Sequence, residues 1–290
     1  NGVWRNFTIS DSFEPGSTFK PFTIAAGLEE GLIGENQTFV CDGGEEVGGW
    51  NIGCHRRSGH GTITLTEALS QSCNDALMQI AAIEGRNLFH KYQTFFGFGS
   101  KTGIDLPGET EGLLTSVENL NSSELATSSF GQTFTVSMVQ MVAGYSSLVN
   151  GGNYYKPHIV KQILNDDGAV IKEIEPEILK KTSSVKTSDF IQRSMYSAVE
   201  EGTAKKASVI GYKVAGKTGT AQKQPRTAGT YVVSFLGHVP ADNPEVVIFV
   251  VIDEAENVPT QANSALATEL ASAILKDVLP FLEVYPTEEV

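Results

Sequence analysis

The chain has 290 residues, of which 40% are hydrophobic and 19% are charged, a balance that suits one large globular domain. Its formal net charge is -13 and its basic residues are dispersed, which argues against nucleic acid as a partner. The longest fully apolar run, residues 246–252, is far shorter than the roughly 18 residues that a membrane-spanning helix needs, so it is expected to be a buried strand.

The hydrophobic pattern predicts helices and strands along the chain. Apolar residues recur three and four positions apart in the segments predicted to be helices: 17–31, 64–84, 133–150, 187–201 and 262–283. β-Branched and aromatic residues mark the segments predicted to be strands: 157–164, 169–175, 211–216, 230–239 and 245–253. On the last helix, Leu270, Ile274 and Leu279 share one stripe and are expected to cover the sheet. We therefore expect an α+β fold, with an antiparallel sheet flanked by helices and a helical subdomain beside it.

A serine and a lysine stand three residues apart near the start of the chain. Pro15 and Gly16 precede Ser17, so the serine is predicted to lie in the first turn of a helix, with Lys20 on the same face. The start of a helix adds backbone N–H donors and positive potential around the hydroxyl. Taken alone, the pair is more simply explained as a helix cap followed by a surface lysine.

Two further polar motifs follow. Ser72-Cys73-Asn74 opens a helical stretch, where capping is the simpler explanation of the motif in isolation, and Cys73 is expected to be a small buried filler. Lys217-Thr218-Gly219-Thr220 follows a strand-like segment. Glycine inside a strand often marks a place where another backbone or a ligand approaches closely, so a lysine and two hydroxyls around it would form a cradle for a carboxylate.

In this order and at these separations, the three motifs resemble those of the penicilloyl-serine transferases. The resemblance to class B penicillin-binding proteins, of the penicillin-binding protein 2 or sporulation type, extends over nearly the whole chain. It is carried by residues 13–20, 129–132, 149–152 and 214–222. It implies the serine β-lactamase and penicillin-binding transpeptidase fold, with residues 1–290 as a single domain. A membrane anchor and a pedestal domain are then expected outside this chain.

The resemblance also implies acyl transfer through Ser17. The serine would attack the penultimate D-alanine carbonyl of a peptidoglycan stem peptide, expel the terminal D-alanine, and pass the acyl group to an amine of a neighbouring strand. β-Lactams would acylate the same serine. Lys20 is the expected base and has to be neutral, a state that burial beside Lys217 would favour.

The remaining motif residues receive supporting roles from the same resemblance. Ser72 would relay a proton and Asn74 would hold the substrate amide. Lys217, Thr218 and Thr220, around Gly219, would bind the terminal carboxylate, and the backbone N–H groups of the nucleophile and of Thr220 would hold the oxyanion. The chemistry needs no cofactor. The resemblance places the protein at the extracytoplasmic face of the bacterial membrane, with membrane and glycosyltransferase partners contacted through domains outside this chain.

Other functions stay open at this point. The same motifs serve β-lactam sensor domains and class D-like β-lactamases, although these would be expected to carry valine or a similar residue where Asn74 stands. A class A β-lactamase would carry a deacylating glutamate within ExxLN, and the segment 118–121 is one residue too short for that motif. We expect it to be loop and helix-cap polarity. A non-catalytic cell-wall scaffold is the alternative from another class of protein.

A cluster of cysteines and histidines lies in a glycine-rich stretch. Cys41 and Cys54 are followed by His55 and His60, and Asp42 adjoins the first thiol. A disulfide and a structural zinc site of Cys41, Cys54 and His60, with Asp42 or His55 as the fourth ligand, are equally open, and inert thiols are a third possibility. Some sporulation-related class B proteins look similar here, which makes a role for the cysteines the better expectation.

Overall fold

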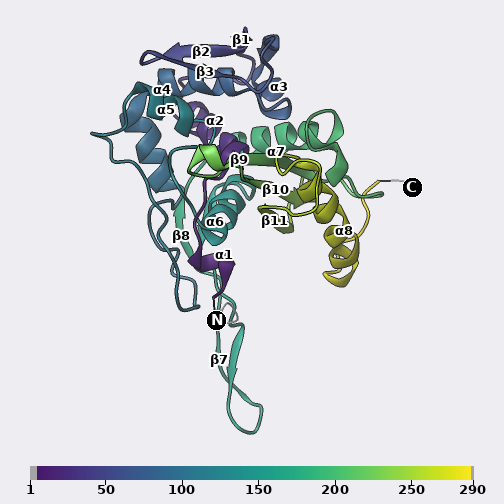
Figure 1. Ribbon diagram of the computed structural model, residues 1–290. Coiled ribbons are helices and arrows are strands. Elements are labelled where there is room, and N and C mark those ends of the chain that lie inside the picture. Colours follow the sequence, from purple (N-terminus) through teal and green to yellow (C-terminus); the bar gives the residue numbers. More distant parts are fainter. Residues whose placement is uncertain (1–4, 289–290) are drawn as a thin grey trace.

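The structure is a computed structural model that describes residues 5–288, and Figure 1 shows how its elements are arranged. The α-helices are α1 (Phe7–Ser10), α2 (Lys20–Glu29), α3 (Leu65–Ser70), α4 (Asn74–Phe95), α5 (Ser122–Ser128), α6 (Met138–Val149), α7 (Val185–Glu200) and α8 (Ala265–Phe281). The strands are β1 (Thr38–Cys41), β2 (Gly44–Val47), β3 (Trp50–Gly53), β4 (Gly61–Thr64), β5 (Asn153–Tyr155), β6 (Gln162–Leu164), β7 (Val170–Glu173), β8 (Ile178–Lys181), β9 (Ala215–Gln222), β10 (Tyr231–Val239) and β11 (Val246–Asp253). Short 3-10 turns are η2 (Gly16–Phe19), η3 (Lys205–Ala207) and η4 (Arg226–Ala228).

A three-stranded antiparallel sheet, in the order β11, β10, β9, provides one wall of the site. β10 is the middle strand and is buried along nearly its whole length. The strand predicted at 211–216 begins only at Ala215 and continues to Gln222, so the lysine-threonine-glycine motif lies inside the strand. The apolar run 246–252 does form a strand, as predicted. Only Phe249 and Val250 are buried within it, because β11 lies at an edge of the sheet.

Helix α8 packs against β10 and β11. Its fully buried apolar residues are spaced four apart: Ala267, Ala271, Leu275 and Leu279. The predicted stripe was wrong for two of its three members, since Leu270 and Ile274 are 44% and 37% exposed. Alanine adds little to a hydrophobic pattern, yet its small side chain lets a helix approach a sheet closely. The larger residues beside the alanines therefore gave a misleading stripe.

The helical subdomain is built around α2, whose residues 20–27 are all buried. Aromatic edge contacts hold the helix in place: the ring centroid of Phe19 lies 4.7 Å from that of Phe134, and the centroid of Phe22 lies 5.0 Å from that of Phe98. Each such contact adds about 0.5–1.5 kcal/mol beyond the burial of the rings. This packing fixes the start of α2, where the serine-lysine motif lies.

The helix predicted at 64–84 is two helices in the structure. α3 ends at Ser70, α4 begins at Asn74 and continues to Phe95, and Ser72 between them has a φ of +59°. A left-handed conformation is uncommon for residues other than glycine and is often found at functional sites. The serine-asparagine motif, residues 72–74, therefore lies at a tight corner between two helices and not inside one regular helix.

Small antiparallel strand pairs lie at two ends of the molecule, outside the sheet and the helical subdomain. Residues 38–64 form two separate antiparallel pairs, β1 with β4 and β2 with β3, which lie beyond α4 and α5 at the top of Figure 1. β6 and β7 form an exposed hairpin that projects at the opposite end, and they fall within the strands predicted at 157–164 and 169–175. No helix among residues 5–288 is long and apolar enough to cross a membrane.

Candidate active site

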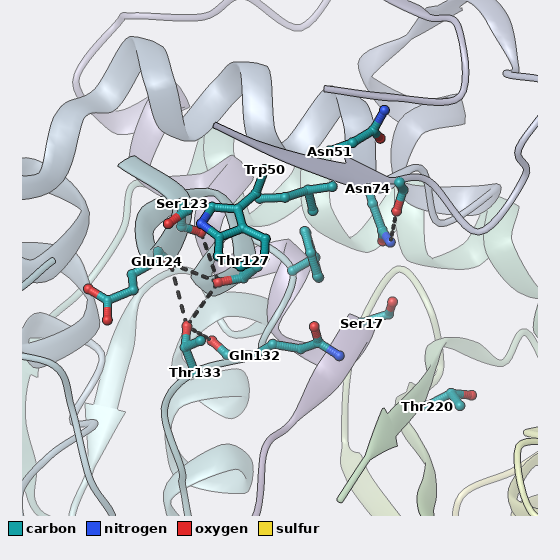
Figure 2. Close-up of a pocket in the computed structure, with 13 residues that line it drawn as sticks. Ser17, Trp50, Asn51, Asn74, Ser123, Glu124, Thr127, Gln132, Thr133 and Thr220 are labelled. Atoms are coloured by element: carbon teal, nitrogen blue, oxygen red, sulfur yellow. Dashed lines mark hydrogen bonds between the residues drawn. The ribbon is translucent and has the colours of Figure 1, made fainter. Parts of the chain in front are cut away.

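Ser17 lies in the 3-10 turn η2, which leads directly into α2. The prediction of a first helical turn is therefore right in position, although the turn is tighter than an α-helical one. Ser17 is half-buried and lines a cleft of about 550 Å³, which also reaches Asn74 and Thr220. Figure 2 shows the serine hydroxyl facing this cleft, between the ends of the two other motifs.

Lys20 is fully buried at the start of α2. Its Nζ donates to the Ser72 carbonyl oxygen at 2.6 Å, to the Ser72 Oγ at 3.1 Å and to the Asn74 Oδ1 at 2.7 Å. Burial away from water lowers the pKa of Lys20 to about 7. A large share of the amine is therefore neutral near pH 7, which is the condition for a proton acceptor.

The corner between α3 and α4 presents the second motif. Ser72 is 8% exposed, and its positive φ directs its carbonyl oxygen to Lys20. Asn74 opens α4, and its Nδ2 donates to the Gly53 carbonyl at 3.5 Å, a long contact to the strand β3. The Cys73 sulfur between them accepts the N–H of Ala76 and caps α4. The corner thus holds a hydroxyl and an amide against the same amine.

The third motif lies on β9, facing the other two. Lys217 is fully buried, and burial together with the nearby charge of Lys20 holds the pKa of Lys217 well below its usual range. Its Nζ donates to the Thr218 carbonyl at 3.2 Å, and the Thr218 hydroxyl meets that of Thr203 at 3.1 Å. Thr220 is exposed at the rim of the cleft. Lys20 and Lys217 are therefore two buried amines, close enough for the charge of one to lower the pKa of the other.

Three glycines allow the backbones of these segments to come together. A Cβ on Gly219 would lie 2.3 Å from the Ser234 Oγ and 3.1 Å from the Pro15 carbonyl oxygen. A Cβ on Gly131, whose φ is +86°, would lie 2.0 Å from the Gly16 carbonyl oxygen, and one on Gly16 would lie 2.9 Å from the Thr220 carbonyl oxygen. Close backbone approach explains why glycine stands inside the third motif. Gly131 was not singled out from the sequence, although it belongs to the segment 129–132 that carried the family resemblance.

The far end of the cleft comes from elements that sequence reasoning did not assign to the site. Trp50 and Asn51 on β3 and Ser123, Glu124 and Thr127 on α5 line it, as Figure 2 shows. Within the segment 118–121, Asn121 caps α5 with its side chain, as the interpretation of this segment as cap polarity predicted. A two-glycine turn among acidic residues carries little pattern, so the hairpin that bears Trp50 could not be placed from sequence.

Three buried cysteines and the half-buried His60 form a compact group. The Cys41 Sγ lies 3.3 Å from the His60 Nδ1, and the Cys54 Sγ lies 3.7 Å from that nitrogen and 3.9 Å from the Cys73 Sγ. The ligand atoms of these four residues all lie within 4.8 Å of one another. All three thiols are free, and the hydrogen bond between Cys54 and Cys73 lowers the pKa of Cys54.

The fourth member of this group differs from the sequence prediction. Asp42 and His55, the two residues expected in that position, are exposed and are not among these four, although the His55 Nδ1 lies 3.8 Å from the Cys54 Sγ. Cys73, expected to be a buried filler, is buried but contributes its thiol to the group. The correction follows from the corner between α3 and α4, which brings a residue distant in sequence up to Cys54.

Comparisons with known proteins agree with this architecture. Residues 1–276 match the penicillin binding protein transpeptidase domain. The chain is 39% identical over 287 residues to stage V sporulation protein D of Bacillus subtilis, covering 97% of this chain and 44% of that protein. It is 30% identical over 294 residues to the peptidoglycan D,D-transpeptidase FtsI of Escherichia coli K12, covering 97% of this chain and 46% of that protein.

A solved structure gives the same result at the level of the fold. Penicillin-binding protein 3 of Mycobacterium tuberculosis, crystallised in complex with ampicillin, superimposes with a TM-score of 0.88 at 27% identity, over 98% of this chain and 65% of that one. The chain spans less than half the length of the two curated relatives described above. Its match to the domain family covers most of its residues, so this chain belongs to the penicillin-binding protein transpeptidase domain family.

Proposed function

We propose that this chain is a D,D-transpeptidase unit that cross-links peptidoglycan stem peptides through an acyl-enzyme on Ser17. The observation that carries the proposal is a pair of buried amines, Lys20 and Lys217, in motifs whose other members Ser17 and Thr220 line one cleft. One of them, Lys20, has a pKa of about 7 and is bound to Ser72 and Asn74. An amine kept partly neutral next to a hydroxyl is the arrangement that activates a serine nucleophile.

Acylation begins with proton transfer from the Ser17 hydroxyl to neutral Lys20. The Oγ of Ser17 forms a bond to the carbonyl carbon of the penultimate D-alanine while the peptide C–N bond breaks. Neutral Lys20 can donate its two N–H groups to the Ser72 carbonyl and the Asn74 Oδ1 while its one lone pair accepts the Ser17 proton. The ammonium that forms has a third N–H, which passes a proton to the Ser72 Oγ. Ser72 then delivers the proton to the departing nitrogen, and D-alanine leaves.

The β9 side of the cleft would hold the substrate's terminal carboxylate and the developing oxyanion. The carboxylate is placed against Thr218, Thr220 and the Lys217 amine, with Gly219 giving the close approach. The N–H groups of Ser17 and Thr220 are assigned to the oxyanion, a role in which one donor contributes about 3 kcal/mol. In the second half-reaction an acceptor amine attacks the ester, and its proton returns along the same route to Ser17.

A long-lived acyl-enzyme is favoured over rapid hydrolysis. Glu124 is the one carboxylate among the described residues that line the cleft, and an oxygen of it accepts the Asn121 N–H at 3.2 Å. That carboxylate lies at the Trp50 end of the cleft, away from Ser17 and Thr220 in Figure 2. The position of that carboxylate counts against a class A β-lactamase, and Asn74 counts against a class D-like enzyme or a sensor, which would be expected to carry valine or a similar residue there. The complete set of polar groups around Ser17 counts against a scaffold.

Intact-mass measurement after incubation with benzylpenicillin tests the proposal. One penicilloyl adduct per chain, stable for hours, is expected, and the Ser17→Ala variant should carry none. Loss of the adduct within seconds would identify a β-lactamase instead. Turnover of a stem-peptide donor with an added amine acceptor separates an enzyme, which forms the new amide, from a sensor, which does not.

We also propose that Cys41, Cys54, Cys73 and His60 hold a structural zinc ion. In a tetrahedral site with Zn–S of about 2.3 Å and Zn–N of about 2.0 Å, the ligand atoms lie roughly 3.5–3.8 Å apart. The distances of 3.3, 3.7 and 3.9 Å between these side chains fit that tetrahedron. Bound zinc would join residues 41–60 to the corner that carries Ser72 and Asn74, without taking part in the acyl transfer.

Metal analysis combined with thiol titration under non-reducing conditions decides between zinc and a disulfide. One zinc per chain is expected, with all three thiols titratable after denaturation with a chelator. Cys73→Ser should lose the metal, whereas Asp42→Asn and His55→Gln should keep it. Two thiols protected in the absence of metal would establish the disulfide.

The cellular setting belongs to the same proposal. Peptidoglycan cross-links form outside the cytoplasm, so the chain would act at the extracytoplasmic face of the membrane and would be acylated there by β-lactams. Membrane and glycosyltransferase contacts are assigned to segments outside this chain, since the relatives are more than twice the length that it covers. Detection of the full-length protein after surface labelling of intact cells tests the location.

A further inference from the structure

Trp50 is directed toward the cleft by the pairing of its hairpin. In the β2–β3 register Val47 stands opposite Trp50, so these two side chains share one face with Ile52, two residues along. Val47 and Ile52 pack on the buried residues Met78, Ala126 and Phe130. Trp50, on the same inward face, is nevertheless 69% exposed, because it extends beyond this packing and over the cleft.

The groups around Trp50 define the chemistry of that end of the cleft. Ser123 and Thr127 lie beside the indole in Figure 2, and Glu124 follows on the same helix. Glu124 is also the only charged side chain among the described residues that line the cleft. The Glu124 carboxylate lies beyond the indole in Figure 2, and one of its oxygens accepts the Asn121 N–H. An aromatic face and a carboxylate beyond it both attract an organic cation, through the ring quadrupole and the negative charge respectively.

The direction of the substrate follows from the proposed function, on which this inference rests. The terminal carboxylate of the donor peptide is assigned to the β9 side, at Thr218 and Thr220. Residues on the other side of the attacked carbonyl must then extend away from β9, past Ser17 and toward Trp50 (Figure 2). The acceptor amine replaces the leaving D-alanine nitrogen and has to approach from the β9 side, so it does not compete for the Trp50 end.

We propose that Trp50 and Glu124 form a subsite for the ammonium-bearing side chain of the donor peptide's diamino acid residue. The aliphatic part of that side chain would lie against the indole, and its ammonium group would lie near the Glu124 carboxylate. Trp50 is thus a specificity-determining residue that recognises the diamino acid side chain, which precedes the two D-alanines of the donor peptide. It is distinct from the groups that carry out acyl transfer.

Competition against fluorescent penicillin tests this subsite with two matched peptides, Nα-acetyl-L-lysyl-D-alanyl-D-alanine and its Nε-acetylated form. The measured quantity is the peptide concentration that halves the rate of Ser17 labelling. The ammonium form should be roughly tenfold more potent, the size expected from a partly solvated cation–π contact acting with an exposed ion pair. Any contact between Trp50 and the penicillin itself cancels in the ratio of the two peptides.

Variants assign that preference to the two side chains. Trp50→Ala and Glu124→Gln should each lower the potency ratio to about three, because each removes about half of the free energy behind the tenfold preference, while Trp50→Phe should keep most of it. Glutamine can still accept the Asn121 N–H that Glu124 accepts, so α5 keeps its cap. Tyr285→Ala is the matched control, since Tyr285 is 72% exposed and does not line the cleft, and it should leave the ratio unchanged.

Labelling in the absence of peptide shows that each variant is folded and that Ser17 reacts. Equal potency of the two peptides with the wild-type chain would overturn the subsite, as would no competition by either peptide or a ratio that both variants preserve. In those cases Ser17 is still labelled and the proposed function stands. Absence of labelling in the wild-type chain would instead overturn the proposed function, and this inference with it.

Discussion

The pH dependence of Ser17 acylation tests the proposed base directly. Lys20 accepts a proton only when it is neutral, and its pKa of about 7 places that change within the range where the protein can be assayed. The neutral fraction then rises from about 9% at pH 6 to about 91% at pH 8. The second-order rate constant for acylation by benzylpenicillin should therefore increase roughly tenfold between these pH values, with a midpoint near pH 7.

The direction of this effect follows from burial. Enclosure raises the free energy of the charged amine relative to the neutral one, so the proton leaves at lower pH than it would in water. Stopped-flow or rapid-quench labelling from pH 5.5 to 9 measures the pH profile of acylation. Lys20→Arg keeps the positive charge but cannot act as a base near neutral pH, so it should reduce the acylation rate constant by at least about 100-fold. A flat profile between pH 6 and 8 in the wild-type chain would refute Lys20 as the base.

Three further predictions concern the residues that support the site. Gly131→Ala places a Cβ 2.0 Å from the Gly16 carbonyl oxygen and should abolish penicillin labelling or folding. Gly168→Ala is the control, because Gly168 has a similar φ of +81° but no atom lies within 4 Å of the added Cβ. In the same thermal and penicillin assays it should lower stability only slightly and leave labelling intact. Ser72→Ala should slow acylation by about 10²–10⁴-fold with an unchanged melting temperature, and an unchanged rate would remove Ser72 from the proton path. Burial raises the pKa of Glu84 well above its usual range, and neither of its oxygens has a hydrogen-bond partner among the described residues. The folded chain therefore holds the Glu84 proton to a higher pH than the unfolded chain does. The free energy of unfolding of the wild-type chain should fall as pH rises toward that raised pKa. Glu84→Gln should not show that loss and should be more stable than the wild-type chain at pH 8 by about 1 kcal/mol or more. Thermal unfolding of both chains at pH 5 and pH 8 measures the difference. Parallel pH dependence in the two chains would contradict a raised pKa for Glu84.

Local patterns predicted much of the fold because they report local physics. Proline and glycine before Ser17 indicated the turn, and the apolar run 246–252 indicated a strand, since both depend on neighbours in sequence. The buried face of α8 was predicted wrongly, because the close approach of the sheet selects alanines such as Ala267 and Ala271 that a hydrophobic pattern underweights. The break at Ser72 was also absent from the prediction, because a tertiary contact to Lys20 holds a conformation that local preference opposes.

The site itself was predictable only where a motif marked it. The serine-lysine, serine-asparagine and lysine-threonine-glycine motifs identified the polar groups, and the family resemblance implied that they converge. The backbone contacts of Gly16 and Gly131 that allow this convergence had no local signal. Cys73 was assigned to packing because its partner Cys54 is 19 residues away and no spacing rule joins them. Trp50 had no sequence signal at all, since its role depends on where a short hairpin lies.

Mapping the penicilloyl ester by proteolysis and tandem mass spectrometry tests the central claim most directly. The account predicts one modified residue, Ser17, in a peptide that is unmodified when the chain is unfolded before penicillin is added. An ester on any other residue, or a folded chain that remains unmodified after prolonged exposure to millimolar benzylpenicillin, would contradict it.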